Sequence, residues 1–146
     1  MKNLEKELKA LDQAFLEIHE KVPQLKVNSL KAPEDVVALW KIEDAAKNAM
    51  YASLSGDGEE LILTIESEVG QWLEIDLDAA KALLELNHSK LNLARVAVTE
   101  DQRLTVLHRR WLSGISVFDA FDALAEVWNT AEGLREDLRA TAPSLA

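Results

Sequence analysis

The residues that could carry out chemistry are few and widely spaced. His19, His88 and His108 fall in a predicted helix, at a helix end and in a predicted strand, without the His-x-x-x-His spacing of a helical zinc site. Glu74 and Asp76 are two residues apart, so on a strand both carboxylates face the same side, where they could chelate a hard cation. The wetted face of a one-sided sheet has the same pattern. We therefore predict no metal site.

The chain also lacks the motifs of common enzyme classes. It has no cysteine, which excludes disulfides and thiolate chemistry, and it has no Gly-x-Ser-x-Gly nucleophile elbow. Its five glycines fit turns or helix breaks rather than a phosphate-binding loop. We predict that the protein is not an enzyme and needs no cofactor. The alternative function is a small metal- or ligand-dependent enzyme or sensor that uses the Glu74/Asp76 face.

One basic cluster, His108-Arg109-Arg110-Trp111, stands out near the end of a predicted strand. On a strand Arg109 and Trp111 share one face, opposite His108 and Arg110. Arginine and tryptophan often carry the binding energy of protein interfaces, whereas charges on an edge strand can also serve to discourage aggregation. Both explanations stay open. The partner-binding candidates on the predicted sheet are Trp72, Glu74, Asp76, Arg109 and Trp111.

The charge balance disfavours some partners and favours others. Sixteen Lys and Arg against 26 Asp and Glu give a net charge of −10, which argues against direct binding to nucleic acid or to an anionic membrane. Residues 57–78 hold eight acids and no Lys or Arg, whereas residues 81–110 hold six bases against three acids. Such a distribution can steer a basic protein or a second copy of the chain. The charged first residues show no apolar signal region, so a cytoplasmic location is expected.

Hydrophobic spacing predicts an α+β protein with one antiparallel sheet of about five strands backed by helices. The first helix spans residues 3–21 and ends before Pro23, and its apolar residues at positions 4, 8, 11, 15, 18 and 22 form one narrow stripe. This stripe either packs on the protein's own sheet, which we favour, or faces a partner. Pro33, followed by Glu34 and Asp35, predicts a second helix over residues 33–47, after a connector at 24–32.

Strands are predicted near residues 50–54, 60–66 and 71–77, with turns at 55–58 and at Gly70. A helix follows over residues 78–86, and then a hairpin of strands 91–98 and 103–112, turned by Glu100 and Asp101. A final helix begins near Ser116. The predicted order is helix, helix, three strands, helix, two strands, helix. These elements form a single domain over residues 1–140, whose strands and later helices occupy residues 48–138, with a loose tail at 141–146.

From residue 48 to residue 138 the chain resembles the YbjN family and the structurally related type III secretion chaperones. The resemblance is carried by LLELN at 83–87, the hairpin LNLARVAVTEDQRLTVLHRRWL and the helix SVFDAFDALAEVWNTAEGL. It implies a twisted antiparallel sheet backed by helices, in proteins that are commonly dimers. The secretion chaperones clamp an extended client segment in apolar grooves, partly against the first helix. The residues that match this groove wall are Leu4, Leu8, Leu11 and Phe15.

The predicted second helix departs from that pattern and could cover the groove. The resemblance also implies dimer contacts on the helix 78–86 and the strand 91–98, with the candidates Leu83, Leu84, Leu86, Leu91 and Leu93. The sequence therefore predicts a non-enzymatic protein-binding module, chaperone- or adaptor-like, that forms a homodimer. Charge complementarity favours a protein partner with a basic face, such as a nucleic-acid-binding protein.

Overall fold

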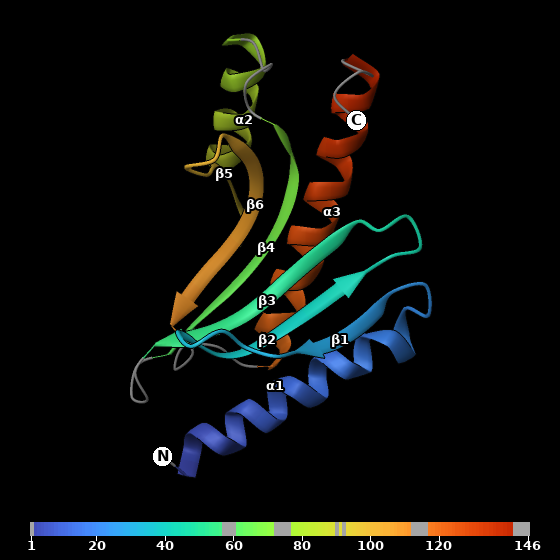
Figure 1. Ribbon diagram of the computed structural model, residues 1–146. Coiled ribbons are helices and arrows are strands. Elements are labelled where there is room, and N and C mark those ends of the chain that lie inside the picture. Colours follow the sequence, from blue (N-terminus) through green and yellow to red (C-terminus); the bar gives the residue numbers. More distant parts are fainter. Residues whose placement is uncertain are drawn as a thin grey trace. The chain divides into compact units, whose positions relative to one another are not determined.

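The structure is a computed structural model that describes residues 2–56, 61–71, 77–89, 91, 93–111 and 117–141 (Figure 1). Its helices and strands are α1 (Lys2–Lys21), β1 (Lys26–Leu30), β2 (Val36–Glu43), β3 (Ala49–Gly56), β4 (Leu61–Gln71), α2 (Leu77–Ser89), β5 (Arg95–Val98), β6 (Arg103–Trp111) and α3 (Val117–Thr141). The strands form one six-stranded sheet in the order β1-β2-β3-β4-β6-β5. The predicted α+β class with an antiparallel sheet and helices is confirmed, with six strands in place of about five.

The chain divides into two compact units. The first contains Met1–Ile65 and Arg109–Phe121, and the second contains Glu66–His108 and Asp122–Ala146. Three elements, β4, β6 and α3, contribute residues to both units. Among the described residues, no helix is long and apolar enough to span a membrane.

In the first unit, α1 packs by its apolar stripe, as the favoured sequence interpretation predicted. Leu11, Phe15 and Ile18 are buried, and α1 lies along β1 (Figure 1). The ring of Phe15 meets the indole of Trp40 edge-on, with centroids 4.5 Å apart and planes at 61°. The Trp40 Nε1–H donates to Asp12 Oδ1 at 2.8 Å, which satisfies the one polar group of this buried indole.

The helix predicted over residues 33–47 is wrong, because residues 36–43 form strand β2. Positions 36, 39 and 40 fit a helical period, but more accessible and buried residues alternate from Leu39, with Trp40 and Ile42 buried. Pro33 starts a turn instead of a helix: its carbonyl accepts the Val36 N–H at 3.0 Å. The connector predicted at 24–32 is also wrong, since it contains β1, which pairs antiparallel with β2.

A five-residue loop joins β2 to β3. The Asp44 Oδ1 accepts the backbone N–H groups of Ala46 and Asn48, each at 3.0 Å, and Lys47 takes a left-handed backbone conformation with φ of 68°. An Asp side chain that accepts backbone N–H groups in this way mimics a turn of backbone, so Asp44 sets the hairpin geometry. The predicted strand near 50–54 is confirmed, and it extends to Ala49–Gly56 as β3.

In the second half of the chain several predicted elements are present with changed bounds. Strand β4 continues through Gly70 to Gln71, so the turn predicted at Gly70 is wrong. The strand predicted over 71–77 falls mainly on residues 72–76, which lie outside the described residues. The helix predicted over 78–86 is α2, and the hairpin predicted after it is β5 and β6, with a turn at Glu100 and Asp101. The final helix, α3, runs past Gly133 to Thr141.

Candidate partner-binding surfaces

Two of the four residues predicted to form a client groove on α1 are buried in the core. Leu11 and Phe15 are 3% and 0% exposed, so they belong to the core of the first unit and are not available to a partner. Leu8 is partly exposed, and the side chain of Leu4 lies outside the described residues. The physical reason is the strand β2, which lies where a helix was predicted and gives the stripe an intramolecular partner in Trp40. We therefore remove Leu11 and Phe15 from the candidate surface.

Three other candidates, Trp72, Glu74 and Asp76, also lie outside the described residues. The partner role of these residues and the alternative function at the Glu74/Asp76 face stay predictions. Among the residues that the structure does describe, no group of three or more His, Cys, Asp and Glu side chains could hold a metal ion. Arg109 and Trp111 are both exposed, on the same face of β6, and His108 on the opposite face is buried.

Helix α2 is a largely exposed element of the second unit. None of its 13 residues is buried, and Leu77 and Leu84 are 72% and 68% exposed. Leu77, Ala80 and Leu84 follow one another at i, i+3 and i+7, which places them along one side of the helix. A short helix without a buried face has little packing energy to hold it. Large exposed apolar side chains on one side of a helix make that side a candidate interaction surface.

An apolar groove of about 330 Å³ lies beside this helix, within the second unit. Its walls come from α2, β5 and the start of β6, and its lining residues are Ala80, Leu83, Leu84, Asn87, Val96, Ala97, Val98 and Leu104. Two predicted dimer residues, Leu83 and Leu84, line this groove. Leu86, Leu91 and Leu93 are partly exposed and are not among the lining residues. The surface therefore offers a protruding leucine next to a hollow.

Asn87 fastens α2 to the edge of the sheet. Strand β5 is the last strand, and the Thr99 N–H donates to the Arg103 carbonyl at 2.9 Å, next to the β5–β6 ladder. Along an antiparallel pair, the residues of one strand point their backbone N–H and C=O groups alternately toward and away from the partner strand. Since Thr99 bonds to β6, the backbone groups of Ala97 and Arg95 also face β6, and those of Val96 face outward. The Asn87 amide takes both: its Oδ1 accepts the Val96 N–H at 2.6 Å, and its Nδ2 donates to the Val96 carbonyl at 2.9 Å.

Asn87 was not among the sequence candidates. Its place at the end of LLELN gave no direct signal, because only the position of α2 beside β5 shows that its planar amide pairs with backbone groups as another strand would. Its effect is to close part of the free edge of β5 to strand addition by another chain. A partner at this end of the second unit therefore meets side chains of α2 and the groove, and finds the backbone groups of Val96 already paired.

The segment between α2 and β5 is held by side chains from two other elements. The Glu126 carboxylate on α3 accepts the N–H groups of Leu93 and Ala94 at 3.0 and 3.3 Å. The Nδ1 of His108, on β6, lies 2.7 Å from the Leu93 carbonyl, and because a carbonyl only accepts, this nitrogen carries the proton. His108 is 5% exposed, so it is a buried structural histidine and not a surface one.

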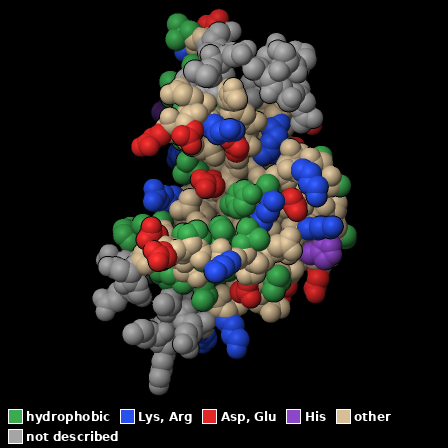
Figure 2. All heavy atoms as spheres, viewed as in Figure 1, with side chains coloured by type: hydrophobic (Ala, Val, Ile, Leu, Met, Phe, Trp, Pro, Cys, Tyr) green, Lys and Arg blue, Asp and Glu red, His purple; other side chains and the backbone are tan. Residues whose placement is uncertain are grey.

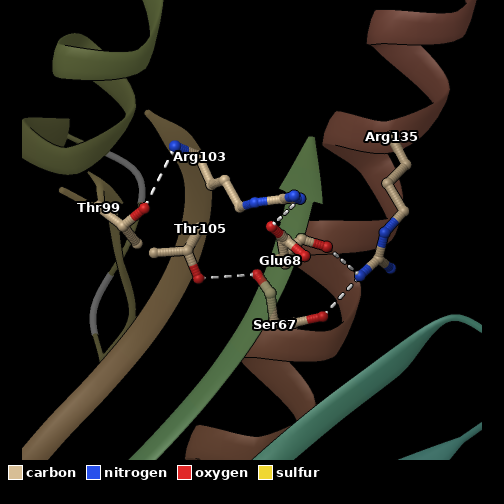
Figure 3. Close-up of polar contacts among 6 residues, drawn as sticks. All are labelled: Ser67, Glu68, Thr99, Arg103, Thr105 and Arg135. Carbon is tan, nitrogen blue, oxygen red and sulfur yellow. Dashed lines mark hydrogen bonds and ion pairs between the residues drawn. The ribbon is translucent and has the colours of Figure 1, made fainter. Parts of the chain in front are cut away.

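A buried arginine fixes the other end of the second unit (Figure 3). The Nη2 of Arg135, on α3, donates to the Ser67 Oγ at 2.6 Å and to the Glu68 carbonyl at 2.7 Å. Thr105 on β6 donates to the Ser67 carbonyl at 3.1 Å. Arg103 forms an exposed ion pair with Glu68 at 2.6 Å. These contacts hold α3, β4 and β6 together and so stabilise the second unit, to which α2 also belongs.

A second hollow, of about 730 Å³, lies within the first unit. Its lining residues are Glu34, Asp35, Val36, Val37, Gly56, Ile62 and Trp111. In the space-filling view, acidic and hydrophobic side chains gather together where β2 begins (Figure 2). Trp111 is 53% exposed, and it is the predicted partner-binding residue that this hollow contains.

No protein-family model matches the chain, and no curated protein matches its sequence. Its fold is nevertheless similar to solved structures. A chain of the ExsC–ExsE complex matches with a TM-score of 0.58 at 13% identity, over 88% of this chain and 92% of that chain. A chain from the complex of the Yersinia pestis type III secretion chaperone SycH with a stable fragment of YscM2 gives 0.52 at 12% identity, over 85% and 98%.

A chain of the heterodimeric ExoU–SpcU complex, from the type III secretion system of Pseudomonas aeruginosa, gives a TM-score of 0.53 at 16% identity, over 86% of this chain and 94% of that chain. The similarity extends over nearly the whole of each chain. The protein therefore has a type III secretion chaperone-like fold. At these identities the likeness concerns the fold alone.

Proposed function

We propose that this protein is a non-enzymatic protein-binding module, chaperone- or adaptor-like, that works as a homodimer. The observation that carries the proposal is α2, a 13-residue helix with no buried residue and with Leu77 and Leu84 largely exposed. Burying an exposed leucine contributes about 1.5–3 kcal/mol, so a surface with two of them is stabilised when another protein covers it. The fold supports the proposal, because each of the similar solved structures is a complex between two proteins. One of them contains a type III secretion chaperone bound to a fragment of another protein.

A second copy of the chain is the partner that we propose for α2 and β5. A twofold interface uses the same patch on both subunits, so the patch must be complementary to itself. Here Leu84 protrudes beside a groove lined by Leu83, Val96 and Val98, and an opposing copy would supply a leucine to each groove. The residue resemblance to the YbjN family and the secretion chaperones pointed to this same pair of elements.

We further propose that the dimer binds another protein with a basic face, such as a nucleic-acid-binding protein, in the cytoplasm. The net charge of −10 supports this choice, and it argues against direct binding to nucleic acid or to a membrane. Attraction between exposed charges is screened by salt. Partner capture from lysate should therefore recover basic proteins at low ionic strength and lose them as salt is added.

Site-specific cross-linking tests the dimer directly, because the wild-type chain has no cysteine and gives no background. In the Leu84→Cys variant, a short bismaleimide should link two copies at micromolar protein. The matched control is Leu16→Cys, whose site is also exposed, at 45%, but lies on α1. Equal yields of cross-linked dimer from the two variants, or none from either, would contradict the proposed interface.

A further inference from the structure

The hollow of the first unit combines an apolar wall with an acidic rim. Val37, Ile62 and Trp111 come from three different strands and all reach it, so their side chains lie on the same face of the sheet. Val37 is 41% exposed and Trp111 is 53% exposed. Tryptophan is enriched among the residues that carry most of the binding energy of interfaces, so an exposed indole beside valine and isoleucine is a candidate anchor for a partner side chain.

The rim comes from the turn that precedes β2. Glu34 and Asp35 both line the hollow and both are exposed, and the turn is closed by the bond from the Val36 N–H to the Pro33 carbonyl. Within the described part of the chain, Glu34 and Asp35 take no part in the ion pairs of Lys41 with Glu43 and of Arg103 with Glu68, and neither carboxylate forms another ion pair there. Arg109 lies two residues before Trp111 on the same face. Counting it, the rim keeps a net charge of −1.

We propose that this hollow binds an arginine side chain, flanked by apolar residues, from an extended segment of the partner protein. The guanidinium would lie on the exposed face of the Trp111 indole, where the ring quadrupole attracts a cation. Its planar N–H groups would donate to the carboxylates of Glu34 and Asp35, and a charged donor and acceptor make the stronger class of hydrogen bond. Arginine is favoured over lysine because it can stack on a ring and donate in two directions at once.

The neighbouring apolar residue of the segment has a place on the wall. Val36, Val37 and Ile62 offer aliphatic surface beside the indole, so the hollow suits an arginine with a leucine or valine next to it. This inference rests on the proposed function, since it names the chemistry by which the module recognises a basic partner. It concerns the first unit only, and the proposed dimer surface lies on the second.

A blocked pentapeptide, Ala-Leu-Arg-Leu-Ala, tests the proposal by nuclear magnetic resonance of the four indole N–H signals. The Trp111 signal is assigned as the one missing from Trp111→Phe. Titration of the peptide into the full-length chain should shift that signal. The matched peptide with citrulline in place of arginine has the same shape without the charge, and it should bind about tenfold or more weakly.

Two charge variants separate recognition from general electrostatics. Glu34→Gln with Asp35→Asn should weaken arginine-peptide binding by about the same factor as citrulline. Glu100→Gln with Asp101→Asn removes the same charge from the exposed β5–β6 turn and should leave binding unchanged. Equal binding of the two peptides, equal effects of the two double variants, or no shift of the Trp111 signal would overturn the inference.

The same experiment can also show that the hollow binds something other than an arginine side chain. A Trp111 shift that depends on protein concentration without peptide would give this surface to a second copy of the chain and would also overturn the inference. Failure here is distinct from failure of the proposed function. If Trp111→Ala still captures the partners that the wild type captures, only the arginine site falls. If the wild type captures no partner and does not dimerise, the proposed function falls.

Discussion

Asn87 shows how one side chain can decide which contacts an edge strand makes. Its amide pairs with both outward-facing backbone groups of Val96, so α2 substitutes for a seventh strand at that position. The composition of LLELN gives no direct sign of this role, because an asparagine at the end of a helix is equally a stop signal. The position of β5 relative to α2 had to be known before the pairing could be recognised.

We expect Asn87→Ala to destabilise the protein by about 1–3 kcal/mol, because it leaves the N–H and C=O of Val96 without their partner. Urea denaturation measures the change, with Asn28→Ala as the control, since Asn28 is exposed on β1. The variant should also aggregate faster than the control, because the strand edge is uncovered. A stability equal to that of the control would contradict the role that we give to Asn87.

Two arginines contact the Ser67–Glu68 segment, and they differ in burial: Arg135 is buried, whereas Arg103 is exposed. Arg135→Met keeps the aliphatic stem but removes the hydrogen bonds from the guanidinium to the Ser67 hydroxyl and the Glu68 carbonyl, so we expect the free energy of unfolding to fall by about 3 kcal/mol. Arg103→Met breaks an ion pair whose side chains are 49% and 50% exposed, which should cost no more than about 1 kcal/mol. Comparable losses for the two variants in chemical denaturation would show that the buried arginine is not a structural centre.

At the scale of elements, the sequence correctly predicted the helices and strands whose hydrophobic residues follow a long and regular spacing. The stripe of α1, the helix after Leu77 and the hairpin around Glu100 all have a clear period and clear turn residues. Strand β2 was misread because positions 36, 39 and 40 match a helical face and because Pro33, Glu34 and Asp35 imitate a helix start. Strand β1 was missed because KVNSL is short and mostly polar, and its pairing with β2 is a tertiary contact.

The misread strand changed the interpretation of α1, and a substitution pair checks the correction. Phe15→Ala removes the ring that packs on Trp40 in the core and should cost about 3–5 kcal/mol. Leu16→Ala, one position along on the exposed side of the same helix, should cost about 0.5 kcal/mol or less. If Phe15 were instead a free groove wall, the two substitutions would have similar small effects on the free energy of unfolding.

At the scale of the whole molecule, the structure places some of the candidate residues in surface hollows and others in the core. Leu83, Leu84 and Trp111 were candidates and do line the two hollows, whereas Leu11 and Phe15 are in the core. Spacing alone cannot tell an apolar stripe that meets its own sheet from one that meets a partner. The acidic rim at Glu34 and Asp35 could not be found from sequence, because those residues were assigned to a helix start.

The central claim is that two copies of this chain associate through α2 and the groove beside it. Light scattering coupled to size exclusion at micromolar protein tests it most directly. The wild type should have twice the 16.3 kDa mass of one chain, and Leu84→Glu should have the mass of one chain, because a buried, unpaired carboxylate opposes association. A wild type of 16.3 kDa, or a Leu84→Glu variant that stays dimeric, would contradict the account.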